Sequence, residues 1–429
     1  MPALPLRLLS LLMAVLFSAC DPGKPVPGKT SSPLTHSAYV WQRVWTDSVR
    51  AAVTNHGSAF AELGVLGTQL EWKSGNPVPA AVRPDVNWKA LSATHRPVSA
   101  VIRIERPGAD DEIVKAVLAE ASRLRQAAAA DGLTLSVVQI DYDCPQKKLA
   151  SYAAWLSRIS ESLKPLPVRI TTLASWLNEK DFLTLLRACH QYVLQVHSFE
   201  RPAPGRRASV CDPDKTRAWV KQASALGHSF TVALPTYRAT AGYDASGKLL
   251  GVATDSVTPR WVAGTTLEEF PSNPDELSAL IAEWNRDRPA GLTGIWWYRL
   301  PVETDTRNWR WPALAAVMAG RAPISKLEVQ FNGAQPVDLV LWNRGEKDEW
   351  MPAKVTIRWP APAHAVGDGA AGWDFAAGEN EGVFTAPPAL RKRLLPPDQS
   401  MALGWLRFQE PAPPAASLRT EISSQARDR

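Results

Sequence analysis

The stretch Val137-Val138-Gln139-Ile140-Asp141-Tyr142-Asp143-Cys144-Pro145 decides how the rest of the chain is interpreted. Side chains alternate along a β-strand, so Gln139, Asp141 and Asp143 share one face and apolar residues occupy the other. This pattern predicts a barrel strand whose inner face becomes polar toward its C-terminal end. Pro145 cannot continue a sheet ladder and ends the strand. Because the C-terminal ends of barrel strands hold catalytic residues, the two aspartates are candidates for acid–base chemistry. The alternative is a turn at Asp143 and an arginine partner for Asp141.

Strand-like and helix-like segments alternate on both sides of this stretch. The strongest helical pattern runs from Asp110 to Ala130, where Gly132 ends it, and another runs from Leu149 to Leu163. Such alternation predicts parallel βαβ units, and eight strands close a (β/α)8 TIM barrel. An open doubly wound sheet is the alternative, although no glycine-rich dinucleotide fingerprint follows the first strand. The eight strands are expected to begin near Ala38, Val65, Val98, Leu133, Val168, Tyr192, Phe230 and Gly294.

The pattern changes after Pro323, where the helical period is lost. Short strand-like runs separated by Gly, Pro and Asn predict a small all-β, sandwich-like domain over residues 323–409. The barrel is then expected to occupy residues 38–322, with a polar loop from Arg238 to about Gly264. Residues 410–429 have few large apolar side chains and are expected to form a disordered tail.

The first twenty residues predict an exported protein. Arg7 is followed by an apolar run from Leu8 to Phe17 and then by Ser18-Ala19-Cys20. This segment resembles a bacterial lipoprotein signal, which implies lipidation of Cys20 and a periplasm-facing protein anchored to the membrane. An ordinary secretory signal or an uncleaved anchor is the alternative. Asp21 resembles an inner-membrane retention signal, and residues 21–37 are expected to be a flexible tether.

Charge and composition restrict the class of partner. The 429 residues carry 48 basic and 42 acidic side chains, a net charge of +6 without a basic run interleaved with aromatics. Nucleic acid is therefore not expected as a partner. The chain has 18 tryptophans, whose flat rings suit sugar rings as well as helix packing. No Cys/His spacing resembles a metal site, and no cofactor is expected.

Applying the alternation rule to the other strands predicts a polar mouth at one end of the barrel. Four carboxylates are candidates for catalysis, namely Asp141, Asp143, Glu105 and Glu71. A pair of carboxylates can hydrolyse a glycoside, with one acid protonating the leaving oxygen and the other acting as nucleophile or base. A carbohydrate is therefore the expected partner. Residues expected to bind it are Gln139, Arg103, Gln195, His197, Trp176, Tyr237, Trp297 and Tyr298.

Some of these residues have a plainer interpretation. His197 could be a hydrogen-bonded core histidine, and Arg103 a structural partner of Glu105 or Asp141. Among the cysteines, Cys144 and Cys211 are expected at the same end of the barrel, where a disulfide between them is plausible in an oxidising compartment.

Three segments carry a family resemblance: Gln139-Ile-Asp-Tyr-Asp-Cys-Pro, Trp176-Leu, and Tyr192-Val-Leu-Gln-Val-His-Ser. They resemble an uncharacterised family of bacterial exported proteins, a domain of unknown function placed among glycosidase-like TIM barrels. The resemblance covers roughly residues 38–322 and implies a barrel without an established activity.

A looser similarity is to the family-18 chitinases, whose fourth strand ends in Asp-x-Asp-x-Glu. Asp141 and Asp143 match the two aspartates, but Pro145 stands at the position of the catalytic glutamate. The acid must then come from Asp143, Glu105 or Glu71. The sequence therefore predicts a glycoside-hydrolase-like envelope protein, or alternatively a non-catalytic glycan-binding or scaffold protein.

Overall fold

The computed structural model describes residues 33–73, 75–197, 209–254, 260–361, 363–391, 393–409 and 412–423. The predicted signal segment and Cys20 lie outside these residues. Strand β1 begins at Thr35, so the expected tether of residues 21–37 overlaps the first strand of the barrel.

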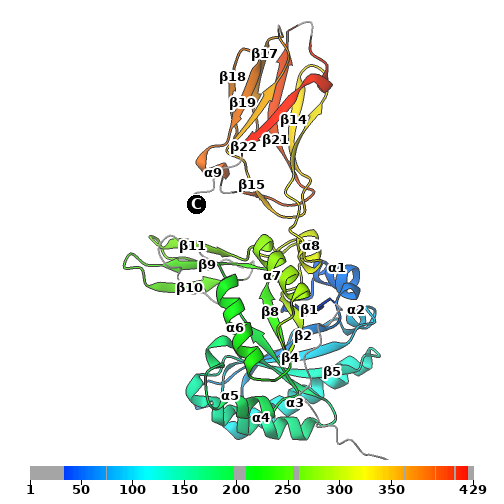
Figure 1. Ribbon diagram of the computed structural model, residues 1–429, viewed down its shortest axis with the longest axis vertical. Helices are drawn as coiled ribbons and strands as arrows, with labels where there is room; N and C mark the ends of the chain where they lie inside the picture. The colour runs from blue at the N-terminus through cyan, green and yellow to red at the C-terminus, as the bar shows by residue number, and fades with distance from the viewer. Residues whose placement is uncertain are drawn as a thin grey trace, which may run out of the picture. The chain divides into compact units, whose positions relative to one another are not determined.

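Eight parallel strands form a closed barrel (Figure 1). Their order is β1, β2, β4, β5, β6, β7, β8 and β12, and β12 pairs again with β1. This closure confirms the predicted TIM barrel and rules out the open doubly wound sheet. The strands are β1 (Thr35–Val40), β2 (Leu63–Glu71), β4 (Val98–Arg106), β5 (Leu135–Tyr142), β6 (Val168–Leu173), β7 (Gln191–Gln195), β8 (Phe230–Pro235) and β12 (Leu292–Tyr298).

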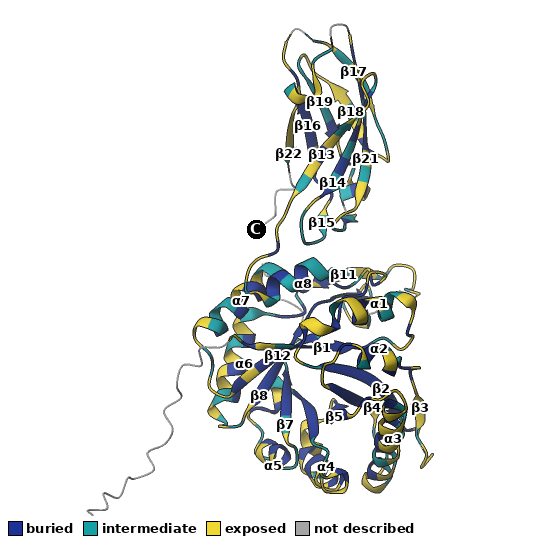
Figure 2. Cartoon of the chain, turned by 90° about the vertical axis from the view of Figure 1, so that its right-hand side faces the viewer, coloured by how far each residue is buried: buried dark blue, intermediate teal, exposed yellow. Residues whose placement is uncertain are grey.

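Helices cover the outside of the barrel, and the strands beneath them are largely buried (Figure 2). The predicted bounds of α3 and α4 are confirmed. Gly132, with φ of 72°, takes the left-handed conformation that ends α3. The helices are α1 (Asp47–His56), α2 (Trp88–Ser92), α3 (Asp110–Ala130), α4 (Leu149–Leu163), α5 (Phe182–Arg187), α6 (Pro213–Ala225), α7 (Pro274–Arg286) and α8 (Trp311–Met318); a short strand β3 (Ala80–Val82) pairs with β2.

The segment expected as a polar loop from Arg238 to Gly264 instead contributes to an antiparallel three-stranded arm. Strand β9 (Arg238–Tyr243) lies between β10 (Leu249–Ala253) and β11 (Thr266–Pro271). Ala239 and Ala241, alternate residues of β9, join Phe270 of β11 in a small buried cluster. Small side chains made this strand alternation hard to recognise in the sequence.

The C-terminal residues form antiparallel sheets, as predicted, and two four-stranded sheets share one apolar core. The expected disordered tail is wrong over Arg419–Ser423, because these residues form β22 and pair with β16. The elements are β13 (Leu327–Asn332), β14 (Val337–Asn343), β15 (Glu349–Trp350), β16 (Lys354–Arg358), β17 (Ala365–Gly369), β18 (Asp374–Ala377), β19 (Glu381–Thr385), α9 (Pro388–Arg391), β20 (Leu394–Leu395), β21 (Ser400–Phe408) and β22 (Arg419–Ser423).

A buried ion pair fills the barrel interior near the N-terminal ends of the strands. Two nitrogens of Arg169 donate to the carboxylate of Glu62 at 2.7 and 3.1 Å. Arg169 also donates to Ser99 and Gln139, and its guanidinium carbon lies 4.4 Å from the centre of the Trp296 ring. Only 3% of the Arg169 side chain is exposed, so its charge depends on these partners.

Glu62→Ala should lower the free energy of unfolding by about 3–5 kcal/mol, because it leaves the buried guanidinium of Arg169 without a counter-charge. Urea denaturation followed by tryptophan fluorescence measures the change. The matched control is Glu161→Ala, which removes a surface pair with Lys164 and should cost at most about 1 kcal/mol. Equal losses in the two variants would contradict the structural role of Arg169.

Candidate functional site

The C-terminal ends of the barrel strands form the mouth, which is lined by inward-facing residues. On β5, Val138 and Ile140 join the outer core, so Gln139, Asp141 and Asp143 face inward. On β4, Ile102 and Ile104 likewise join the outer core, which turns Arg103 and Glu105 inward. The predicted alternation of both strands is therefore confirmed, and their register sets Arg103 opposite Asp141.

Arg103 lies among three carboxylates. Its Nη1 donates to Asp141 Oδ2 at 2.8 Å, its Nε lies 3.7 Å from Glu105, and its Nη2 lies 3.9 Å from Asp143. Asp141 is buried, whereas 55% of the Asp143 side chain is exposed. One guanidinium thus holds the inner carboxylate and leaves the outer two accessible to a ligand.

The electrostatics of the mouth raise the pKa of Asp143. Burial raises the pKa of Asp143 above its ordinary value, and the charge of Asp141 raises it further, while Arg103 acts in the opposite direction. Water reaches the exposed part of the side chain and limits the rise. Burial disfavours the charged form of Arg103, but the charges of Asp141 and Asp143 outweigh this effect and raise its pKa. Arg103 therefore stays a cation.

Aromatic side chains form the opposite wall of the mouth. His197 stacks on Tyr298 with ring centres 5.5 Å apart, and its Nδ1 lies 3.1 Å from the hydroxyl of Tyr237. Burial lowers the pKa of His197 to about 4, so the imidazole is neutral at neutral pH. Trp41 packs edge-on against Tyr298. Apolar ring faces and neutral donors opposite the carboxylates suit a ligand that is part apolar and part hydroxylated.

Gln139 and Gln195 point inward as predicted, but Gln139 lies below the mouth. Its amide nitrogen donates to Tyr39 and Thr171, and its oxygen accepts from Arg169. Gln139 therefore belongs to the network of the buried ion pair. Gln195 follows the inward-facing Val193 on β7 by two residues and shares its face.

Three predicted site residues lie away from this centre. Glu71 pairs with Arg106 at 3.4 Å rather than with Arg103. Trp297 faces outward, where its indole nitrogen donates to His36, because Trp296 and Tyr298 take the inward positions of β12. Trp176 is fully buried beneath helices and donates to the carbonyl of Cys144, so it supports the turn after β5 instead of overhanging the mouth.

The predicted disulfide between Cys144 and Cys211 is not formed, and both residues are buried free thiols. Cys211 precedes α6 and contacts the hydroxyl of Thr216, while Cys144 contacts the carbonyl of Pro145. The two thiols follow β7 and β5, which are separated by β6. The thiols therefore follow strands that are not neighbours in the barrel, although both strands end at the mouth.

Sequence reasoning missed three residues of the barrel interior: Tyr39, Trp41 and Arg169. Tyr39 stacks on Trp296 at 4.5 Å and accepts a hydrogen bond from Gln139. All three could have been found by applying the alternation rule to β1 and β6 as it was applied to β4 and β5.

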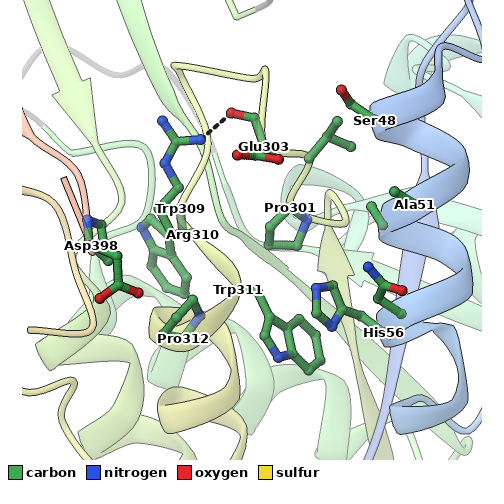
Figure 3. A pocket seen from close by; sticks show the side chains of 14 residues that line it. Ser48, Ala51, His56, Pro301, Glu303, Trp309, Arg310, Trp311, Pro312 and Asp398 are labelled. Carbon is green, nitrogen blue, oxygen red and sulfur yellow. Dashed lines mark hydrogen bonds between the residues drawn. The ribbon is translucent and has the colours of Figure 1, made fainter.

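A separate pocket of about 240 Å³ lies between α1 and the segment that leads into α8 (Figure 3). Trp311 stacks on His56 there with ring centres 4.0 Å apart, and Arg310 donates to the carbonyl of Glu303. Its lining does not include Asp141, Asp143, Arg103 or Tyr298. This pocket is distinct from the mouth and has no paired carboxylates linked by an arginine.

Within the described residues, no group of three or more His, Cys, Asp and Glu side chains is arranged to hold a metal ion. In the same residues, no helix is long and apolar enough to cross a membrane.

Residues 94–303 match the family described as "Domain of unknown function (DUF3142)". The DUF3142 match includes every strand from β4 to β12 and hence Arg103, Asp141, His197 and Tyr298. It supports the resemblance inferred from the sequence, over a narrower range than residues 38–322. A search of curated proteins found no match.

Several solved structures have a fold similar to that of this chain. The spore cortex-lytic enzyme SleL of Bacillus megaterium QM B1551 has a TM-score of 0.48 and 11% identity, covering 70% of this chain and 76% of that chain. A chitinase from Chromobacterium violaceum ATCC 12472 has a TM-score of 0.44 and 14% identity, covering 67% and 98%. A mutant of a class V chitinase from Nicotiana tobaccum, in complex with NAG4, has a TM-score of 0.41 and 13% identity, covering 62% and 94%. Similarity at this level assigns no activity to this chain.

Asp141→Asn should lower the pKa of Asp143, because it removes a neighbouring negative charge and frees Arg103 to pair with Asp143. Carbon-13 NMR titration of the side-chain carboxyls measures this value. Asp111→Asn, which alters an exposed carboxylate paired with Arg158 on the outer helices, should leave the pKa of Asp143 unchanged. A pKa of Asp143 that stays the same or rises in Asp141→Asn would contradict the coupling.

Proposed function

We propose that the mouth of the barrel hydrolyses a glycosidic bond in an oligosaccharide or polysaccharide. The observation that carries the proposal is the pair of accessible carboxylates, Asp143 and Glu105, each within 4.0 Å of the Arg103 guanidinium. Opposite them lies the aromatic wall of His197 and Tyr298. Two carboxylates beside an aromatic surface are the groups that glycoside hydrolysis requires.

The roles follow from burial and charge. Asp143 has a raised pKa and an exposed side chain, so it is the proton donor to the leaving oxygen. Glu105 is the carboxylate that takes a proton from the attacking water. Asp141 is buried against Arg103 and cannot contact substrate, so it is a positioning residue that holds Arg103 and raises the pKa of Asp143. Pro145 supplies no acid, so the donor lies earlier in the chain, at Asp143.

Asp143→Asn should reduce kcat by about 10²–10⁴-fold, the usual contribution of a general acid. Glu105→Gln should give a loss of similar size. The assay measures released reducing ends from a panel of soluble oligosaccharides, using the chain without residues 1–20. The control is Glu71→Gln, which removes the carboxylate paired with Arg106 and should leave kcat nearly unchanged. Turnover that survives in both Asp143→Asn and Glu105→Gln would refute these roles.

A non-catalytic glycan-binding or scaffold function is the second candidate. Pro145 stands where the resembled chitinases carry their catalytic glutamate, and this observation favours it. Saturable binding of an oligosaccharide with no product detected by mass spectrometry would support this candidate. Cleavage that depends on Asp143 would exclude it.

We also propose that the chain is exported and anchored to the bacterial membrane through a lipid on Cys20, facing the periplasm. The support is the order Arg7, apolar run, Ser18-Ala19-Cys20, with Asp21 favouring the inner membrane. A single acyl chain binds membranes only reversibly, so stable anchoring needs more than one chain.

Cys20→Ser should abolish incorporation of radiolabelled palmitate and move the protein from the membrane fraction to the soluble fraction. The matched control is Cys189→Ser, which replaces a half-buried thiol of the barrel and should leave both readouts unchanged. Label retained in Cys20→Ser would contradict the anchor at this residue.

A further inference from the structure

One face of the C-terminal β domain carries two tryptophans that do not contribute to its core. On β14, Leu339 and Leu341 are buried, so Trp342 lies on the outer face. On β21, Leu406 is buried and Trp405 lies on the outer face. Both indoles are half-buried. Burying both rings in the core would have been the more stabilising use of tryptophan, so their outward position calls for another explanation.

The strand register places these rings on a shared platform. β14 and β21 pair directly, with Val340 opposite Ala402 between the two rings. Trp405 lies opposite Asp338 on β14, four positions from Trp342 on that strand. At about 3.3 Å per residue the rings are separated by roughly 13 Å along the strand. The side chains between the rings, Val340 and Ala402, are short. An extended ligand can therefore lie across both rings.

Polar side chains surround this tryptophan platform, which we define as Trp342, Val340, Ala402 and Trp405. Asp338 and Asp368 flank Trp405 on its two neighbouring strands, and both are exposed. Carboxylates accept hydrogen bonds from hydroxyl groups. Further exposed acceptors and amides on the outer face of β13 are Glu328, Gln330 and Asn332.

The Trp342 ring is covered by a side chain that a ligand could displace. The guanidinium carbon of Arg344 lies 3.9 Å from the ring centre, whereas Arg407 lies 5.9 Å from Trp405. The Trp342 Nε1 is buried without a hydrogen-bond partner in the described part of the chain. A buried indole N–H normally has an acceptor, so this ring lacks a partner that a hydroxylated ligand could supply.

We propose that the tryptophan platform binds a glycan chain through ring stacking on Trp342 and Trp405, with Asp338 and Asp368 accepting hydrogen bonds from sugar hydroxyls. Arg344 and Arg407 lie beside the two rings, but Asp338 and Asp368 flank Trp405 on both sides and would repel the phosphates of a nucleic acid at that ring. An added peptide strand would need a free sheet edge, and the platform is a sheet face. A neutral hydroxylated chain matches both the ring faces and the carboxylates.

This site does not depend on the chemistry proposed for the barrel. It uses residues of the β domain, and it would hold a glycan whether or not the mouth cleaves one. Its ligand belongs to the same chemical class, so the two proposals need separate measurements: binding for the platform and turnover for the mouth.

The test is co-sedimentation of the chain without residues 1–20 with insoluble chitin, cellulose and peptidoglycan sacculi. We expect binding to at least one of these polymers, weakened about tenfold or more in Trp405→Ala and in Trp342→Ala, as is typical when a tryptophan anchor is truncated. Trp350→Ala is the matched control, because Trp350 is 53% exposed on β15, outside this sheet, and it should bind as the parent does. Arg344→Ala should bind at least as tightly as the parent, because it uncovers the Trp342 ring.

A second variant distinguishes loss of the binding surface from unfolding of the β domain. Val340→Arg adds a long side chain between the rings at a half-buried position, and it should also weaken binding about tenfold or more, with an unchanged thermal melting curve. Failure of the parent to bind any of the three polymers, or equal binding by the parent and Val340→Arg, would overturn the platform. Turnover of soluble oligosaccharides should be unaffected by these variants. Loss of turnover in Asp143→Asn with retained polymer binding would separate the two sites.

Discussion

The ion pair between Arg103 and Asp141 determines what the mouth of the barrel can do. Parallel pairing of β4 with β5 sets these two residues opposite each other, and the 2.8 Å contact buries the carboxylate of Asp141. The sequence predicts Asp141 as a catalytic residue, and in the structure its carboxylate is buried against Arg103. Its effect is indirect: it raises the pKa of Asp143 and fixes a guanidinium between the outer carboxylates. The carboxylates of the mouth that solvent can reach are those of Asp143 and Glu105, to which the proposed catalytic roles are given.

The ion pair beneath the mouth imposes a second constraint. Arg169, Glu62 and Gln139 occupy the interior beneath the mouth and are hydrogen-bonded to one another and to Ser99, Tyr39 and Thr171. Removing any one of these side chains would destabilise the fold, because its partners would be left as buried unpaired groups. These side chains fill the interior beneath the mouth, which leaves the mouth itself as the place for the proposed carbohydrate. This arrangement favours a ligand that lies across the end of the barrel over one that enters it.

The sequence allowed the parity of β4 and β5 to be predicted, because alternation is a local property of a strand. It did not decide the parity of β12, where Trp296, Trp297, Tyr298 and Arg299 follow one another and any of them could face inward. Closure of the barrel settles this, since Trp296 must stack on Tyr39 from the neighbouring strand β1. The arm of β9–β11, strand β22 and the separation of the two thiols depend on long-range pairing, which no local pattern encodes.

Aromatic residues form two kinds of surface in this chain, one in the mouth of the barrel and one on the β domain, and carbohydrate binding is proposed for both. In the mouth, Tyr298 and His197 pack on each other and form a wall beside carboxylates. On the β domain, Trp342 and Trp405 lie apart on an open sheet face. A polysaccharide is a repeating ligand, so two sites on one chain can both be filled without an exact spacing between them. Binding at one site then raises the effective concentration of ligand at the other. On the two proposals together, a weak platform would increase the time that a weakly binding mouth spends on the same polysaccharide.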